Sequence, residues 1–299
     1  MRNLPFKKID AFASAKSGGN PAGYIALESL SQLTENEMLK IAKELKGFVS
    51  EVGFAARTGD TEFDLRYYSS EREVDFCGHA TIAIMYDIIK TDPYFHNFET
   101  LTIKTKNDRL VVRNRIVTED SVFIMSPNPV FSDSAPGVKQ IALNLRINVS
   151  DINKEYPVSV INAGLNTLIV PVQNLDTIIS IKPDLDELNA FCKQSGVDIV
   201  HVFTPDTYIK SNNYRTRVFA PTFGYLEDPA TGSGNSAFGY YLLKNRLWTT
   251  GTLLIEQNGF KENHNIVRLQ IEKDEQGRSR VCFGGGAITR IEGEYLLYQ

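Results

Sequence analysis

The sequence has 299 residues, of which 42% are hydrophobic and 23% are charged, and this is the composition of an ordinary globular protein. The formal net charge is −4, and lysine and arginine are interspersed with acidic residues, so we expect no nucleic-acid partner. Three cysteines, Cys77, Cys192 and Cys282, do not suggest a secreted disulfide framework and favour a reducing cytoplasm. No apolar run has the length of a signal-peptide core or a membrane span, so we expect neither export nor membrane insertion.

The predicted elements are mostly short strands with a few helices between them. In the first half we predict, in chain order, strands at 8–12 and 24–27, a helix at 34–45, strands at 52–55 and 63–68, a helix at 80–90 and a strand at 101–105. In the second half we predict strands at 167–172, 199–203, 214–219, 253–257, 266–271 and 280–283, with helices at 185–195 and 236–245. Thr34 followed by Glu37 is typical of a helix N-cap. The pattern indicates a mixed α+β fold.

The middle of the chain has the composition of a connection between domains. Residues 125–137 concentrate proline, serine, aspartate and glycine. We therefore expect an N-terminal lobe of residues 1–125, which the C-terminal strand at 284–299 can complete, and a C-terminal lobe of residues 126–283.

The two halves of the sequence repeat one plan of strand, polar turn and apolar helix. In the first half the helix opens at Gly78-His79, and in the second half it opens at Gly232-Ser233-Gly234. Residues 80–89 are apolar on nearly every helical face, so we expect a sheet curled around this helix. Each helix start offers free N–H groups and the positive end of the helix dipole to an anion. The duplication predicts two such starts facing one cleft.

Several separate motifs resemble the phenazine-biosynthesis PhzF-like family. They are Asp10-Ala11-Phe12, Gly19-Asn20-Pro21-Ala22, Ser50-Glu51, the run from Asp75 to Thr81, Phe219-Ala220-Pro221 with the run from Glu227 to Ser233, and the closing Gly284-Gly285-Gly286. Their order and spacing hold over nearly the whole chain. The resemblance implies a diaminopimelate-epimerase-like fold of two pseudo-symmetric lobes, each a curved sheet around a central helix, with the active site in the cleft between them.

The resemblance also implies an isomerase that works without metal, nucleotide or flavin. It implies that Glu51 is the general acid/base and that residues matching His79, Asp228 and Ser233 surround the substrate. Asn20, Gly78, Gly232 and Gly234 are the further substrate-binding candidates that follow from it. The family's best-known chemistry moves a proton within a dihydro-hydroxyanthranilate ring, so we expect a small carboxylated substrate. A homodimer is implied as well.

General chemistry fits this assignment, because a carboxyl group held away from water is protonated more easily and can both take and return a proton. Each candidate also has a structural alternative. Glu51 could be a solvated turn carboxylate, and His79 could bond only to backbone at a helix start. Asp228 could hold His79 or a substrate amine or hydroxyl, or cap the turn before Pro229. Ser233 could be a helix cap.

Two other functions stay open at this point. An epimerase of the two-thiol kind needs a cysteine at each helix start, but Cys77 has Thr231 as its counterpart, so this chemistry is disfavoured. Whether Cys77 is reactive or only packed is undecided. A ligand-binding module without turnover is the other alternative. The sequence contains no Walker-type loop, HExxH, CxxC or GxSxG motif.

Overall fold

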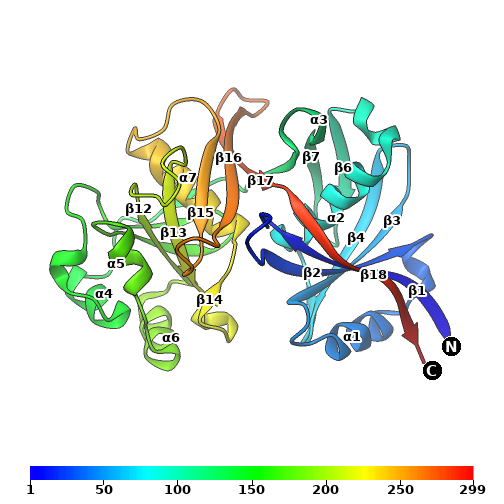
Figure 1. The fold of residues 1–299 in the computed structure, drawn as a ribbon, viewed down its shortest axis with the longest axis horizontal. Coiled ribbons are helices and arrows are strands. Elements are labelled where there is room, and N and C mark those ends of the chain that lie inside the picture. The colour runs from blue at the N-terminus through cyan, green and yellow to red at the C-terminus, as the bar shows by residue number, and fades with distance from the viewer. Residues whose placement is uncertain (299) are drawn as a thin grey trace. The chain divides into compact units, whose positions relative to one another are not determined.

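The computed structural model describes residues 1–298, which form two compact units. Unit 1 contains Met1–Met125 and the C-terminal segment from Gly284, and unit 2 contains Ser126–Phe283 (Figure 1). Each unit has its own sheet and its own buried helix. Within residues 1–298, no helix is both long enough and apolar enough to cross a membrane.

Unit 1 is built from one sheet and a buried helix. Its strands are β1 (Arg2–Ala11), β2 (Asn20–Leu27), β3 (Glu51–Arg57), β4 (Glu62–Ser69), β5 (Glu73–Val74), β6 (Thr100–Lys104), β7 (Arg109–Arg115), β8 (Ser121–Met125) and β18 (Ala287–Leu297). Its α-helices are α1 (Glu35–Glu44), α2 (Gly78–Thr91) and the short α3 (Ile116–Glu119). The strands pair in the order β18, β1, β2, β3, β4, β6, β7, β8, and β5 pairs with β4. The β2–β3 and β4–β6 pairs are parallel.

The apolar helix α2 lies against strands from both ends of this order, including β18, β1, β2, β3 and β8. Its residues from Ala80 to Met85 are fully buried. Gly53 on β3 allows the close approach, because a Cβ atom there would lie 2.2 Å from Cδ1 of Ile84. A curved sheet around a central helix, which the sequence predicts, is confirmed.

Helix α1 covers a second face of unit 1. Thr34 and Glu37 form the predicted capping box, in which each side chain bonds the other residue's backbone N–H. Met38 and Ile41 of α1 pack with Ile25 of the sheet in a separate apolar cluster.

Unit 2 repeats the same plan with more helices. Its strands are β9 (Val130–Phe131), β10 (Ser159–Asn162), β11 (Asn166–Pro171), β12 (Ile199–Thr204), β13 (Tyr214–Phe219), β14 (Glu227–Asp228), β15 (Leu253–Gln257), β16 (Asn265–Lys273) and β17 (Ser279–Gly285). Its α-helices are α4 (Val138–Leu145), α5 (Leu175–Ser180), α6 (Leu185–Ser195) and α7 (Gly232–Lys244). The printed pairs run β9, β10, β11, β12, β13, β15, β16, with β14 on β13, and the β11–β12 and β13–β15 pairs are parallel.

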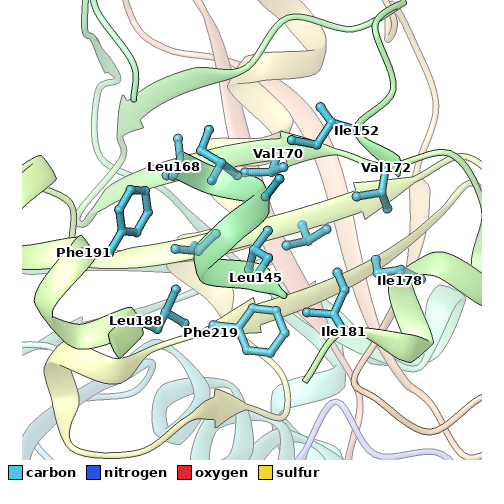
Figure 2. Packing of buried hydrophobic residues seen from close by; sticks show 14 of the residues in the cluster. Leu145, Ile152, Leu168, Val170, Val172, Ile178, Ile181, Leu188, Phe191 and Phe219 are labelled. Carbon is cyan, nitrogen blue, oxygen red and sulfur yellow. The ribbon is translucent and has the colours of Figure 1, made fainter. Parts of the chain in front are cut away.

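Helix α7 is the counterpart of α2, and it contacts β10, β11, β12 and β16. Its residues from Gly234 to Leu242 are buried. On the other face of the sheet, α4, α5 and α6 close an apolar cluster (Figure 2). Members of this cluster include Leu145 of α4, Ile178 of α5 and Leu188 of α6. The predicted mixed α+β fold is therefore confirmed.

The element bounds differ from the sequence predictions in a few places. Helix α6 has the predicted bounds, whereas α7 begins at Gly232, four residues before the predicted start. Glycines and serine in the first turn carry weak helix propensity, so burial against the sheet decides that start. Helices α4 and α5 were not predicted, because eight and six residues give too little periodicity to detect.

Candidate functional site

The predicted acid/base Glu51 lies beside His79 within unit 1. Glu51 is the first residue of β3, and His79 is the second residue of α2. Glu51 Oε2 lies 3.2 Å from His79 Nε2. The two side chains are 22% and 13% exposed, so the pair is mostly shielded from water but open to a small molecule. The structure thus brings together a carboxylate and an imidazole that are 28 positions apart in the sequence.

Cys77 contacts the other ring nitrogen of the same histidine. Its Sγ lies 3.5 Å from His79 Nδ1, and the cysteine is buried. Candidate ligand atoms of Glu51, Cys77 and His79 all lie within 4.8 Å of one another. Among the described residues, this is the group whose spacing could hold a metal ion. The imidazole therefore has a carboxylate on one side and a sulfur on the other.

The electrostatics of this group favour a protonated histidine. Burial by itself lowers the pKa of His79, but its interactions with Cys77 and Glu51 raise that pKa well above 6.5. Burial raises the pKa of the Cys77 thiol, so the thiol stays protonated near neutral pH. The lasting negative charge beside His79 is therefore the carboxylate of Glu51. A cationic acid and a carboxylate base lie in contact, and the buried neutral thiol is a poor nucleophile.

The second predicted helix start, at the beginning of α7, belongs to unit 2. Thr231 precedes the helix without making a side-chain cap, so the first N–H groups of α7 have no capping oxygen. Ser233 in this first turn is partly exposed. Gly232 is required sterically, since a Cβ atom there would lie 2.4 Å from the ring of Phe283. This uncharged helix start suits a carboxylate group.

Asp228 bonds to the residue that precedes this helix. It ends the short strand β14, opposite Val218 of β13, and its Oδ2 accepts a 2.6 Å hydrogen bond from Thr231 Oγ1. The carboxylate therefore helps to hold the turn that contains Pro229, as one of the sequence alternatives has it. Asp228 and Ser233 lie in unit 2, whereas Glu51 and His79 lie in unit 1.

Two further candidates lie at the starts of elements in unit 1. Asn20 is the first residue of β2, is 2% exposed and pairs in register with Ala11. Gly19 before it has φ +64°, and a Cβ atom there would lie 2.7 Å from the Ala11 carbonyl oxygen. Gly78 is the first residue of α2. These positions agree with close backbone packing at the ends of strands.

Gln257 is the site residue that sequence reasoning missed. It is fully buried at the end of β15 and bonds both Thr231 and the backbone of Asp228. It is separated from them by more than 25 positions and belongs to no motif. A polar residue ending an otherwise apolar strand, LLIEQ, is the weak signal that could have indicated it.

Comparisons with known proteins agree over nearly the full length. A family model described as phenazine biosynthesis-like protein matches residues 9–293. An uncharacterized isomerase from Clostridium acetobutylicum is 27% identical over 99% of both chains. The crystal structure of a PhzF-family phenazine biosynthesis protein from Bacillus anthracis is 26% identical, with a TM-score of 0.86 over 99% of this chain and 100% of that one.

A more distant structure shows how far the fold extends. A protein described as a predicted epimerase from Pseudomonas aeruginosa is 19% identical, with a TM-score of 0.76 over 99% of this chain and 100% of that chain. This likeness concerns the fold alone. It supports the epimerase-like architecture that the sequence motifs predict.

Proposed function

Because the chain belongs to the phenazine biosynthesis-like family, we propose that it is an isomerase that moves a proton on a small carboxylated metabolite. Glu51 is the general acid/base in this proposal. The observation that supports it is the 3.2 Å contact between the partly exposed Glu51 carboxylate and the His79 imidazole. Family membership and relatives named isomerases support the class of reaction.

The proposed step needs only this chain's residues and the substrate. The Glu51 carboxylate removes a proton from one substrate carbon, and the resulting anion delocalises towards the substrate's own unsaturated or carboxylate group. The carboxyl group then returns the proton to a second carbon, so the double bond moves and no atom is gained or lost. General acid/base groups of this kind contribute about 10²- to 10⁴-fold to rate.

His79 and the start of α7 take supporting roles in the proposal. The imidazolium of His79 stabilises negative charge that develops next to Glu51. The N–H groups of Gly232, Ser233 and Gly234 bind the substrate carboxylate, because they are uncapped and lie at the positive end of a 13-residue helix. Asp228 binds a donor group of the substrate. Asn20 and Gly78 complete the binding surface.

The same residues make a two-thiol epimerase the weaker candidate. Such an enzyme needs a thiol at each helix start, whereas Cys77 of unit 1 corresponds to Thr231 of unit 2. Burial also raises the pKa of Cys77, which disfavours the thiolate that this chemistry requires. We also carry forward a cytoplasmic homodimer from the family resemblance. Light scattering of the purified protein tests the dimer.

The test is proton exchange in deuterium oxide, followed by NMR with a panel of amino, hydroxy and dihydroaromatic carboxylic acids. We expect wild-type protein to exchange a C–H proton and to form an isomer, and Glu51→Gln to be slower by about 10³-fold. Glu28→Gln is the matched control, because Glu28 is an exposed glutamate of the same unit. Equal exchange by wild type and Glu51→Gln would show that Glu51 is not the base.

A further inference from the structure

The segment 228–231, which leads into α7, is held by three buried amide side chains. Its backbone carbonyls at three positions accept hydrogen bonds of 2.9, 2.8 and 2.8 Å from Gln257, Asn265 and Asn235. These amides are 0%, 1% and 0% exposed. Burying an amide is unfavourable unless its hydrogen bonds are made, so each amide restricts the segment to a conformation that satisfies it.

The hydrogen bonds around Gln257 have a direction that the backbone determines. The backbone N–H of Thr231 can only donate, and it lies 3.1 Å from Gln257 Oε1. The Nε2 end of Gln257 is therefore the donor to Thr231 Oγ1, at 3.2 Å. Since this hydroxyl oxygen accepts from Gln257, its own hydrogen is directed to Asp228 Oδ2, at 2.6 Å.

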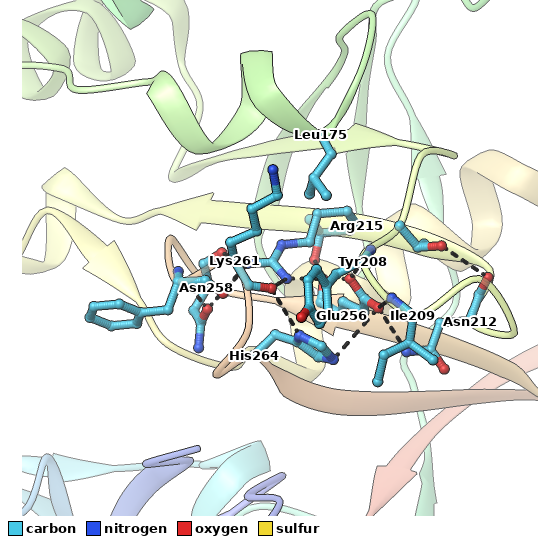
Figure 3. Close-up of polar contacts among 12 residues, drawn as sticks. Leu175, Tyr208, Ile209, Asn212, Arg215, Glu256, Asn258, Lys261 and His264 are labelled. Carbon is cyan, nitrogen blue, oxygen red and sulfur yellow. Dashed lines mark hydrogen bonds and ion pairs between the residues drawn. The ribbon is translucent and has the colours of Figure 1, made fainter. Parts of the chain in front are cut away.

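The strand that carries Gln257 is anchored on its opposite face. Successive residues of a strand point to opposite faces, so Glu256 points away from Gln257. The fully buried Glu256 carboxylate pairs with Arg215 at 3.3 Å and accepts the backbone N–H groups of Tyr208 and Ile209 (Figure 3). The end of β15 is therefore held from both faces, which makes it a rigid support for the segment 228–231.

We propose that Thr231 and Gln257 are positioning residues that present the Asp228 carboxylate as a hydrogen-bond acceptor. A carboxylate has about four acceptor sites, so the bond from Thr231 orients the group and leaves acceptor capacity. An acceptor held in this way selects substrates that carry an amino or hydroxyl donor in addition to their carboxylate. The inference rests on the proposed function, in which Asp228 contacts the substrate.

The positioning is tested by comparing Thr231→Val with Thr231→Ser in crystal structures of the unliganded protein. Valine has nearly the same shape but no hydroxyl, whereas serine keeps the hydroxyl. We expect the Asp228 carboxylate to rotate or become disordered in Thr231→Val and to stay in place in Thr231→Ser. An unmoved carboxylate in Thr231→Val overturns the proposal. If Thr231→Val does not fold, Thr231→Ala removes the same bond and the same outcomes apply.

The selectivity is tested by the binding of two matched probes, 2-aminobenzoate and 2-methylbenzoate. We expect wild type and Thr231→Ser to bind the amino compound about tenfold more tightly, as one hydrogen bond to a charged group would give. Thr231→Val should lose this preference. Equal affinities in wild type, no binding of either probe, or an unchanged preference in Thr231→Val each overturn donor selection. Neither readout needs turnover, so failure here is distinct from failure of the Glu51→Gln exchange experiment.

Discussion

Units 1 and 2 have corresponding strand pairings but different side chains at corresponding positions. Glu51 pairs with Ala22 at the first position of the parallel β2–β3 ladder, and Ile199 pairs with Thr167 at the first position of the parallel β11–β12 ladder. Ile199 of unit 2 therefore takes the place of the proposed base. Counted from the helix starts, Ser233 likewise takes the place of His79.

This difference separates two kinds of chemistry on one scaffold. Unit 1 has a carboxylate and an imidazole in contact, so it is equipped to move protons. Unit 2 has an apolar residue and a hydroxyl at the same places and keeps only the uncharged N–H groups of a helix start. The duplicated fold thus supplies two anion-binding helix starts, and side-chain differences at two positions make one of them suited to acid/base work.

The largest expected effect concerns a pair of charges that the units place differently. Asp64 pairs in register with Lys104 in unit 1, and Arg215 pairs with Glu256 at the corresponding positions of unit 2. Lys104 is exposed, whereas Arg215 and Glu256 are fully buried. Breaking a buried pair leaves an uncompensated charge, so we expect Glu256→Gln to lower the free energy of unfolding by about 3–5 kcal/mol.

Asp64→Asn is the matched control for this comparison, with an expected change within about 0.5 kcal/mol. Urea unfolding followed by circular dichroism measures both variants. Similar losses in the two variants would contradict the view that only unit 2 depends on this pair for stability.

The next effect concerns the strand position that faces the central helix. Unit 1 has Gly53 against Ile84, and unit 2 has His201 stacked on Phe238 with ring centroids 4.8 Å apart. Burial lowers the pKa of His201 from 6.5 to about 4. The unfolded chain therefore binds a proton first as the pH falls, so the stability contributed by neutral His201 is full above about pH 6.5 and is lost towards pH 4.

We expect this loss to be about 3 kcal/mol, from a shift of roughly two units at 1.36 kcal/mol each. The measurement is the free energy of unfolding of wild type and His201→Phe between pH 7 and pH 4. The decrease over this interval should be smaller in the variant. Parallel curves would mean that His201 does not contribute to acid sensitivity.

The smallest pair of effects compares the two helix starts directly. His79→Gln should lower kcat by about 100-fold, because the cation beside the base is lost. Ser233→Ala should leave kcat within about twofold and raise KM by about five- to tenfold, as the loss of one hydrogen bond would. Steady-state kinetics on the substrate found by deuterium exchange measures both. A larger kcat effect for Ser233→Ala than for His79→Gln would reverse the assignment of roles.

The sequence by itself determined the features that depend on local patterns. Strong periodicity and the Thr34–Glu37 capping box identified α1, and α6 was predicted with its observed bounds. The apolar helix around residues 80–89 indicated its own burial. The ordered motifs pointed to the family, and the repeated strand, turn and helix pointed to the duplicated fold. These signals are short-range, so no knowledge of register was needed to detect them.

Only the tertiary structure decided what depends on contacts between distant segments. The contact of Glu51 with His79 follows from where β3 begins relative to α2, and the bonds of Gln257 to the 228–231 segment follow from the end of β15. Strand pairing and helix packing bring such residues together through many weak contacts that no single motif contains. For that reason the residues that carry the proposed chemistry were recognisable in the sequence, whereas the residues that hold them in position were not.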